Sequence, residues 1–311
     1  MKKIAFVFPG QGSQTVGMLE AWQDNSAVQQ ALATANTALD QDLAHLIATG
    51  PEADLNLTTN TQPAMLVSAV GMYQAWREAG GQQPDFMAGH SLGEYSALTA
   101  AGSLHLDDAV KLVRIRANAM QEAVPVGTGT MAALLGLEDD IVREVCREAA
   151  QGEAVEAVNF NAPLQVVIAG QVAAVERACE LAKAKGARRA VVLPVSAPFH
   201  SSLLQPAAEV LERALQQLEL NVPVVPVINS VDVAVATEPD AIRSALVRQA
   251  WHPVRWVETI QYMAQQGVTD IVECGPGKVL AGLIKRIDRQ LSVHNIHDPV
   301  SLQQALTALK G

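Results

Sequence analysis

The chain has 311 residues, 49% of them hydrophobic and 17% charged, which is typical of a globular protein rather than a disordered one. Its formal net charge of −10 and the lack of a basic run argue against a general nucleic-acid binder, which needs a positive surface to displace counterions. No segment approaches the roughly 18 consecutive apolar residues of a membrane span, so we expect no membrane partner. The three cysteines are far apart and odd in number, and we interpret them as buried free thiols in a reducing cytoplasm.

The first predicted element is a buried strand over Lys3–Phe8, followed by a glycine-rich loop over Pro9–Gln14. The apolar run is too short for a signal peptide, because the Pro-Gly pair ends it where such a peptide would continue. The loop contains Gly10 and Gly12, but Thr15 stands where a dinucleotide-binding fingerprint has its third glycine. The loop alone is therefore weak evidence for a dinucleotide site.

Strands and helices alternate through most of the chain. The expected elements are a helix over Gln62–Gly80, a strand over Asp85–Gly89, a helix over Glu94–Ala101, a strand over Val224–Asn229, helices over Ala241–Gln249 and Val254–Gln265, and a strand over Thr269–Cys274. Alternation of this kind indicates a largely parallel sheet covered by helices on both faces. We therefore predict an α/β fold class.

The predicted elements in the middle of the chain have a different order: strand, helix, strand, strand, helix, strand. The expected elements are Thr130–Leu137, Glu138–Ala150, Val155–Phe160, Leu164–Ala169, Gln171–Lys185 and Arg188–Val195. This is the split βαβ order of a ferredoxin-like unit. We therefore predict a large domain over residues 1–126 and 199–311, with an inserted ferredoxin-like (α+β) subdomain over residues 127–198.

Gly89-His90-Ser91-Leu92-Gly93 fits the pattern G-x-S-x-G, with a strand expected before it and a helix after it. In this context the two glycines allow a sharp turn that exposes the serine hydroxyl. The following helix N-terminus would present free N–H groups to a developing oxyanion. The pattern therefore predicts Ser91 as a nucleophile, although such a string can also be a plain glycine-rich turn.

A serine nucleophile needs a base to accept its proton, and seven histidines are available. His45 and His105 lie in polar stretches that look exposed. His294 and His297 lie near the C-terminus, but no acidic residue at a convincing loop position precedes them, and their spacing alone is weak evidence for a metal site. His200 ends a loop that leaves the small subdomain, where it could face a cleft; spacing alone leaves a structural histidine open.

Arg116 falls on the apolar stripe of a helix predicted over Asp107–Gln121. A buried arginine needs an anionic partner, because an unpaired buried cation is costly. The pattern leaves three interpretations open: a substrate anion, an internal salt bridge, or a side chain that reaches the surface.

Four ordered motifs resemble the signatures of bacterial malonyl-CoA:acyl-carrier-protein transacylases. They are FPGQGSQ over Phe8–Gln14, GHSLGEY over Gly89–Tyr95, Phe199-His200-Ser201, and GPGK over Gly275–Lys278. The resemblance runs from Ile4 to Asp288, which is nearly the whole chain. It implies an α/β-hydrolase-like large domain interrupted by a small ferredoxin-like one, in agreement with the pattern of elements.

The resemblance implies a Ser-His dyad in which Ser91 is acylated and His200 is its base. The family orients this histidine with a backbone carbonyl, and the matching residue is Gln249. The matching oxyanion hole consists of the backbone N–H groups of Gln11 and Leu92. A third, acidic residue is not required, in keeping with the lack of an acidic residue at a convincing loop position before His294 and His297.

The resemblance also implies how the substrate is selected. Arg116 matches the residue that binds the malonyl carboxylate, and a planar guanidinium suits bidentate binding of this group. Phe199 resembles the malonyl-selecting rather than the methylmalonyl-selecting variant, although it could simply pack against the cleft wall. His252 stands where asparagine is common, which puts the local support of Gln249 in doubt.

The implied partners are malonyl-CoA and acyl carrier protein, with the CoA thioester as a substrate and no bound cofactor or metal. Carrier proteins of this system are strongly acidic, so we expect docking on local basic patches. The first candidate cluster, at the end of the small subdomain, looks free of acids and consists of Lys183, Lys185, Arg188 and Arg189. The second, near the C-terminal helix, consists of Lys285, Arg286 and Arg289 around the single Asp288. A solvated face that merely balances nearby acids remains an alternative for each.

Two rival functions remain. A serine esterase would carry a Ser-acid-His triad and pass the acyl group to water. A catalytically idle docking subunit of a larger synthase would form no acyl-serine. The sequence also leaves open whether the acceptor serves fatty-acid or polyketide synthesis.

Overall fold

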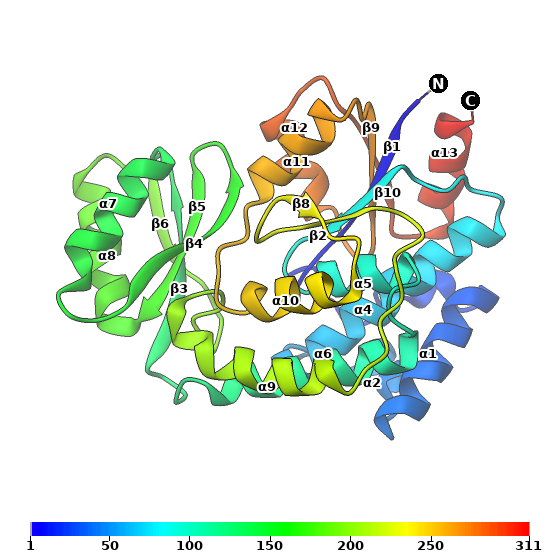
Figure 1. Cartoon of the computed structure of the whole chain (residues 1–311), viewed down its shortest axis with the longest axis horizontal. Helices are drawn as coiled ribbons and strands as arrows, with labels where there is room; N and C mark the ends of the chain where they lie inside the picture. Colours follow the sequence, from blue (N-terminus) through cyan, green and yellow to red (C-terminus); the bar gives the residue numbers. More distant parts are fainter. Residues whose placement is uncertain (1, 311) are drawn as a thin grey trace.

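The computed structural model describes residues 2–310, which form two lobes built around separate sheets (Figure 1). The larger sheet has six strands in the order β10-β9-β1-β2-β7-β8, and the smaller has four in the order β4-β5-β3-β6. Both termini lie at the same end of the large lobe. The predicted α/β class with a separate antiparallel unit is confirmed.

The helices and strands of the large lobe follow the predicted alternation. In chain order they are β1 (Ile4–Phe8), α1 (Ser26–Leu39), α2 (Leu43–Thr49), α3 (Glu52–Leu55), α4 (Thr58–Glu78), β2 (Phe86–Gly89), α5 (Gly93–Ala100), α6 (Leu106–Glu122), α9 (Gln205–Gln216), β7 (Val227–Asn229), β8 (Ala234–Val235), α10 (Pro239–Gln249), α11 (Trp256–Gln265), β9 (Asp270–Cys274), α12 (Val279–Ile287), β10 (Ser292–Ile296) and α13 (Pro299–Leu309). Short 3₁₀ helices cover Glu20–Trp22 and Ser202–Leu204.

Strand β1 is the centre of the large sheet and is buried along its whole length. It pairs in parallel with β2, aligning Ala5 with Phe86, and with β9, aligning Ile4 with Asp270. Helices cover both faces of a parallel sheet, so such a strand contacts apolar side chains on both sides, which explains its continuous apolar run. Only the edge hairpin β7–β8 is antiparallel among the described strands of this sheet.

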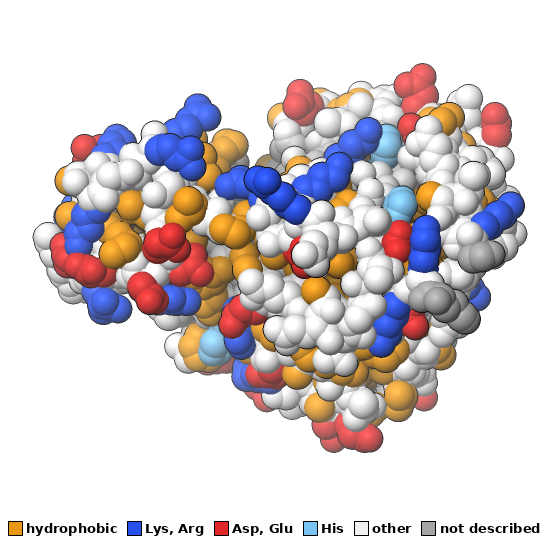
Figure 2. Space-filling view, turned by 90° about the horizontal axis from the view of Figure 1, so that it is seen from above, with side chains coloured by type: hydrophobic (Ala, Val, Ile, Leu, Met, Phe, Trp, Pro, Cys, Tyr) orange, Lys and Arg blue, Asp and Glu red, His pale blue; other side chains and the backbone are white. Residues whose placement is uncertain are grey.

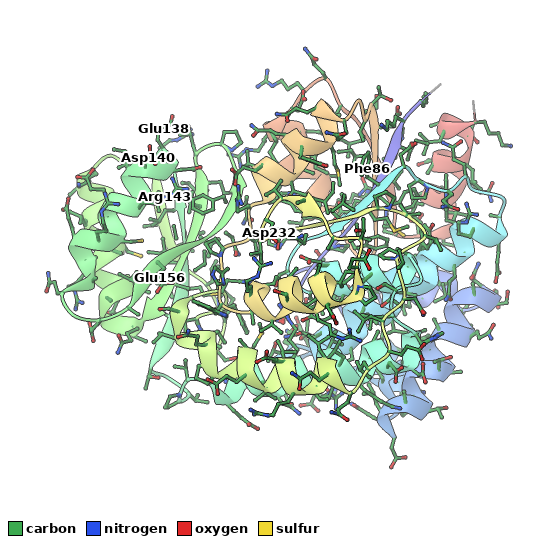
Figure 3. All side chains as sticks on the ribbon, in the orientation of Figure 1. Phe86, Glu138, Asp140, Arg143, Glu156 and Asp232 are labelled. Carbon is green, nitrogen blue, oxygen red and sulfur yellow. The ribbon has the colours of Figure 1, made fainter. Side chains whose placement is uncertain are left out.

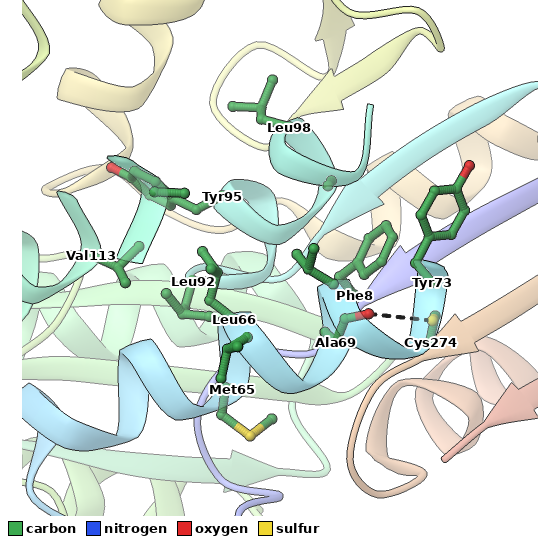
Figure 4. Packing of buried hydrophobic residues seen from close by; sticks show 14 of the residues in the cluster. Phe8, Met65, Leu66, Ala69, Tyr73, Leu92, Tyr95, Leu98, Val113 and Cys274 are labelled. Carbon is green, nitrogen blue, oxygen red and sulfur yellow. Dashed lines mark hydrogen bonds between the residues drawn. The ribbon is translucent and has the colours of Figure 1, made fainter. Parts of the chain in front are cut away.

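The core beneath the sheet is formed where α4 passes under α5 (Figure 4). Met65 and Leu66 of α4 belong to the same buried cluster as Leu92 and Tyr95, at the start of α5. Helix α4 begins at Thr58, earlier than the predicted Gln62. Thr58, Thr61 and Gln62 at its start are polar yet buried, so hydrophobicity alone did not reveal where the helix starts.

The small lobe consists of β3 (Gly129–Leu135), α7 (Asp139–Ala150), β4 (Val155–Ala162), β5 (Gln165–Gln171), α8 (Val172–Ala184) and β6 (Arg189–Val192). These elements have the predicted order and all lie inside the segment 127–198. Its core lies between the sheet and the helices α7 and α8. On the opposite face, a small apolar cluster that includes Met131 and Val158 packs against Phe199, which precedes the predicted base.

A short segment of the large lobe pairs with the edge strand β4 of the small one. Val254 N–H donates to the carbonyl of Val158 at 2.8 Å, and Phe160 N–H donates to the carbonyl of Val254 at 3.0 Å. Because Val254 uses its backbone in this pairing, α11 begins at Trp256 rather than at the predicted Val254. The pairing ties the two lobes together beside the segment that carries Gln249.

Within residues 2–310, no helix combines the length and apolar character that crossing a bilayer requires. Cys146, Cys179 and Cys274 are buried free thiols, as predicted.

Candidate active site

Ser91 lies on the turn between β2 and α5, and its φ of 53° falls in the left-handed region, which is uncommon for serine and frequent at functional turns. Two glycines make this turn fit. A Cβ on Gly89 would lie 1.8 Å from the carbonyl carbon of Gly93, and a Cβ on Gly93 would lie 2.0 Å from the carbonyl oxygen of Phe8. Only glycine fits at either position, so strand, turn and helix can pack closely and present the serine hydroxyl.

His200 is brought against Ser91 from 109 positions further along the chain, with 2.6 Å between Nε2 and Oγ. Its Nδ1 lies 2.8 Å from the backbone carbonyl of Gln249. A carbonyl can only accept, so Nδ1 carries the proton and Nε2 presents its lone pair to the serine hydroxyl. The histidine is thus oriented by a main-chain oxygen instead of an acid, unlike the triad of the esterase alternative.

The imidazole of His200 is held neutral. The side chain is 2% exposed, and burial, with the nearby charge of Arg116, lowers its pKa to about 3. Desolvation disfavours the charged imidazolium, and a neighbouring cation disfavours it further. At neutral pH this histidine can therefore accept a proton from Ser91.

The loop that contains Gln11 lies directly against the nucleophile turn. A Cβ on Gly10 would come within 2.6 Å of the carbonyl oxygen of His90 and 3.7 Å of the Ser91 Cβ. Among the hydrogen bonds between residues 2 and 310, none uses the backbone N–H of Gln11 or of Leu92. Both donors are therefore free among the described residues, and the oxyanion hole that the family resemblance implies stays a prediction.

Arg116 is 2% exposed, and its Nη2 lies 3.3 Å from the Ser91 Oγ. Its Nη1 donates to Gln62 Oε1 at 2.7 Å, and its Nη2 also donates to Gln249 Oε1 at 3.0 Å. The guanidinium carbon lies 5.2 Å from the centre of the Tyr95 ring. In the described part of the chain Arg116 forms no ion pair, and its Nε has no hydrogen-bond partner. The internal salt bridge is therefore excluded within these residues, and the cation retains capacity to bind a substrate anion.

The sequence did not reveal the role of the Gln249 side chain or of Glu94. Gln249 Nε2 donates to the Ser91 carbonyl at 2.9 Å and to Glu94 Oε2 at 3.2 Å. Glu94 is 2% exposed and also accepts from the backbone N–H and the hydroxyl of Ser230. Burial raises the pKa of Glu94, while these donors and the Arg116 charge oppose the rise. The available signal was an acidic residue directly after the nucleophile turn.

Helix α10, which carries Gln249, is supported from two directions. Arg248 makes a two-pronged ion pair with Asp232, with distances of 2.7 and 2.8 Å, and Asp232 is labelled in Figure 3. His252 donates from Nδ1 to the carbonyl of Arg248 at 2.7 Å. His252 therefore stabilises the end of the helix that carries Gln249, although it stands where the family commonly has asparagine.

The small lobe also holds the segment that follows His200. Glu156 of β4, labelled in Figure 3, accepts hydrogen bonds from the backbone N–H of Ser202, at 2.9 Å, and from its hydroxyl. Phe199 packs between the large core and the apolar face of the small sheet. The base therefore lies at the junction of the two lobes, as its position in the sequence suggested.

The other histidines do not reach Ser91. His294 Nε2 lies 3.0 Å from Asp270, and His297 Nε2 lies 3.4 Å from Asp298. His45 and His105 are exposed, as predicted. Among the described residues, no group of three metal-ligating side chains is present.

The first predicted basic cluster is not free of acids in space. Lys185 Nζ lies 2.6 Å from Glu144 and 2.7 Å from Glu148, and Lys183 Nζ lies 2.8 Å from Glu180. The expectation of an acid-free cluster is wrong for both lysines. Glu180 lies one helical turn before Lys183 on α8, whereas Glu144 and Glu148 reach Lys185 because α7 packs beside α8.

Five of the predicted docking residues remain exposed without an ion pair in the described chain: Arg188, Arg189, Lys285, Arg286 and Arg289. Arg286 of α12 reaches the β4–β5 turn of the other lobe, where it donates to the Gln165 side chain. Figure 2 shows lysine and arginine side chains gathered near the notch between the two lobes.

The fold and this site define a serine acyltransferase. A family model described as an acyl transferase domain matches residues 5–307. The malonyl CoA-acyl carrier protein transacylase of Escherichia coli K12 is 52% identical over 307 residues, covering 98% of this chain and 99% of that protein. The Bacillus subtilis 168 protein of the same name is 45% identical over 312 residues, covering 100% of this chain and 98% of its own length. The chain belongs to the malonyl-CoA:acyl-carrier-protein transacylase family.

Solved structures agree with this assignment. The acyl-carrier-protein S-malonyltransferase of Burkholderia pseudomallei 1710b is 60% identical, with a TM-score of 0.97, covering 98% of this chain and 99% of that one. A malonyl-transacylase solved in complex with its type II polyketide acyl-carrier protein is 48% identical, also with a TM-score of 0.97, covering 98% and 99% of the two chains.

Proposed function

We propose that this protein transfers a malonyl group from malonyl-CoA to the phosphopantetheine thiol of acyl carrier protein, through a malonyl-serine intermediate on Ser91. The observation that carries this proposal is the buried cation of Arg116, 3.3 Å from the Ser91 hydroxyl, with an unpartnered Nε. A site for a neutral acyl group has no need of a buried charge at this point, because such a charge is costly unless an anion compensates it.

In the first half of the reaction, His200 Nε2 takes the proton as the Ser91 Oγ attacks the thioester carbonyl carbon. The resulting oxyanion accepts hydrogen bonds from the backbone N–H groups of Leu92, on the nucleophile turn, and Gln11, on the loop beside it. The tetrahedral intermediate then collapses, the carbon–sulfur bond breaks, and His200 returns the proton to the departing CoA thiolate.

In the second half, the carrier protein's thiol gives its proton to His200 and attacks the malonyl-serine carbonyl. Collapse of the second oxyanion releases Ser91, which recovers its proton. The CoA thioester is a substrate here, and the proposed chemistry needs no bound cofactor or metal. We propose a cytoplasmic location. Assays with several purified carrier proteins would decide whether the acceptor serves fatty-acid or polyketide synthesis.

Replacing the arginine tests the substrate assignment. Arg116→Ala should lower kcat/KM for malonyl-CoA at least ~10-fold more than for acetyl-CoA, because only malonyl carries a second carboxylate and a charge-assisted hydrogen bond contributes roughly 1.5–3 kcal/mol. The measurement is acylation of the enzyme by each thioester. An equal loss for both would make Arg116 a structural residue and contradict the assignment.

Charge reversal tests the carrier-protein surface. Arg189→Glu combined with Arg286→Glu should raise KM for acyl carrier protein and flatten its salt dependence, since exposed charges mainly steer association. Acylation by malonyl-CoA should change much less. A matched control reverses two exposed charges elsewhere, Lys111→Glu and Arg213→Glu, on α6 and α9 at the lower edge of Figure 1. If the variant with Arg189→Glu and Arg286→Glu transfers malonyl to carrier protein at the wild-type rate in low salt, the docking surface lies elsewhere. The same conclusion follows if the control variant raises KM for carrier protein equally.

A further inference from the structure

Three consecutive hydrogen bonds join Arg116 to the loop that carries Gln11. Arg116 Nη1 donates to Gln62 Oε1 at 2.7 Å, Gln62 Nε2 donates to Thr58 Oγ1 at 3.2 Å, and Thr58 Oγ1 donates to Gln11 Oε1 at 2.6 Å. Thr58 and Gln62 lie on the first turns of α4 and are 5% and 0% exposed. These three hydrogen bonds thus connect Arg116, the proposed carboxylate-binding residue, to the loop that carries the proposed oxyanion donor.

The direction of each bond is fixed by the atoms involved. An arginine can only donate, so it selects the Gln62 oxygen and turns the Gln62 amide nitrogen toward Thr58. The threonine hydroxyl accepts from that nitrogen and has a single proton left, which it donates to the side-chain oxygen of Gln11. The three hydrogen bonds therefore have one consistent set of directions, and removing the Thr58 hydroxyl breaks two of them.

The exposed side chain of Gln11 is held by the hydroxyl of Thr58. Within residues 2–310 this hydroxyl is its one hydrogen-bond partner. The next anchor of the loop comes three residues later, where Gln14 Nε2 donates to Asn56 Oδ1 at 2.9 Å. Thr58 is thus the buried residue that holds the side chain of Gln11, whose backbone N–H is the proposed oxyanion donor.

We propose that Thr58 is a positioning residue for acyl transfer: its hydroxyl holds Gln11 so that the Gln11 backbone N–H is aimed at the oxyanion, and it links this donor to Arg116 through Gln62. The inference rests on the proposed function of Gln11 and Arg116. Among the described residues Thr58 makes no hydrogen bond to Ser91, His200 or Arg116, so we expect it to act through Gln11 on the rate of the step in which the oxyanion forms.

The test is Thr58→Val, which keeps the shape of the side chain and removes its hydroxyl. The single-turnover rate constant for acylation should fall about 10-fold or more with malonyl-CoA and with acetyl-CoA, because a lost oxyanion donor costs 10²–10³ and a misaligned one costs part of that. A single-turnover rate constant does not depend on the fraction of folded enzyme. Thr58→Ser, which restores the hydroxyl, should recover most of the rate.

Thr61→Val is the matched control, since Thr61 is equally buried on the same helix. Its hydroxyl donates to the carbonyls of Leu55 and Leu57, at 2.6 and 3.0 Å, and touches neither Gln11 nor Gln62. This variant should keep the wild-type rate constant. If Thr61→Val slows acylation as much as Thr58→Val, or if Thr58→Val acylates at the wild-type rate, the proposal is overturned.

Gln11→Met repeats the test from the exposed end of the bond, where folding is not at risk. It removes the acceptor oxygen but keeps the backbone N–H, so it should slow acylation as Thr58→Val does, and the double variant should be no slower than either single one. If Gln11→Met had the wild-type rate constant of acylation, the inference would be contradicted even if Thr58→Val failed to fold. Failure of the wild-type enzyme to form malonyl-serine would instead refute the proposed function, so the two failures are distinguishable.

Discussion

Replacing the nucleophile, Ser91→Ala, should abolish formation of the malonyl-enzyme while the fold persists. The substitution removes only Oγ, which contacts His200 and Arg116 at 2.6 and 3.3 Å. Without this oxygen no covalent intermediate can form; in a serine hydrolase with a comparable nucleophile such a change costs roughly 10⁶-fold in kcat. Intact mass after mixing with malonyl-CoA should show no added malonyl group, and the melting temperature should stay near that of the wild type.

Ser96→Ala on helix α5 is the control for this experiment. Ser96 is fully buried a few residues after the nucleophile, and its hydroxyl has no hydrogen-bond partner within residues 2–310. This variant should acylate at the wild-type rate. If Ser91→Ala still gained malonyl mass, the nucleophile would have to be another residue, and an idle docking subunit would be indicated if the wild type gained none.

Local features of the site were predictable because they depend on short-range geometry. A strand, a glycine-flanked serine and a helix must be contiguous for the nucleophile turn to form, so the motif around Ser91 and the elements that flank it could be found in one sequence. The buried face of α6 was also predictable from its apolar stripe, on which Arg116 falls, although the sequence left open a side chain that reaches the surface. The structure confirms the burial of Arg116.

Long-range contacts could not be obtained in this way. His200 was identified by resemblance and not by spacing, because nothing in the periodicity of the chain states that it meets Ser91. The buried polar side chains Thr58 and Gln62 were missed because their partners come from distant segments. A hydrophobic pattern describes which side chains are buried but not which polar groups are buried in pairs.

Tertiary contacts also explain the two main errors. Helix α11 starts later than predicted because Val254 pairs with β4 of the other lobe. Lys185 looked free of acids because it meets Glu144 and Glu148 only after α7 and α8 pack, across 41 and 37 positions of sequence. Charge read along a chain therefore overestimates a basic patch wherever neighbouring helices contribute acids.

Removing the base, His200→Ala, should lower the rate constant of acylation by about 10²–10⁴-fold, the usual contribution of general-base catalysis. The methyl group cannot accept the Ser91 proton, whereas Arg116, Gln11 and Leu92 remain in place to bind the substrate. KM for malonyl-CoA should therefore change less than kcat. A near-normal rate would require another base.

The pH profile gives the second part of this test. Because the pKa of His200 is lowered to about 3, its Nε2 stays unprotonated through neutral pH, and kcat/KM for malonyl-CoA should lack the acid limb near pH 6.5 that an ordinary histidine produces. The folded pKa lies below the unfolded one, so the unfolded chain binds the proton first: the contribution of this group to the free energy of unfolding is complete above pH 6.5 and is lost as the pH falls toward 3. In the malonyl complex the bound carboxylate offsets the Arg116 charge, so the acid limb of kcat should lie at higher pH than that of kcat/KM. An acid limb of kcat/KM near pH 6.5 would instead show that His200 is not held neutral by its surroundings.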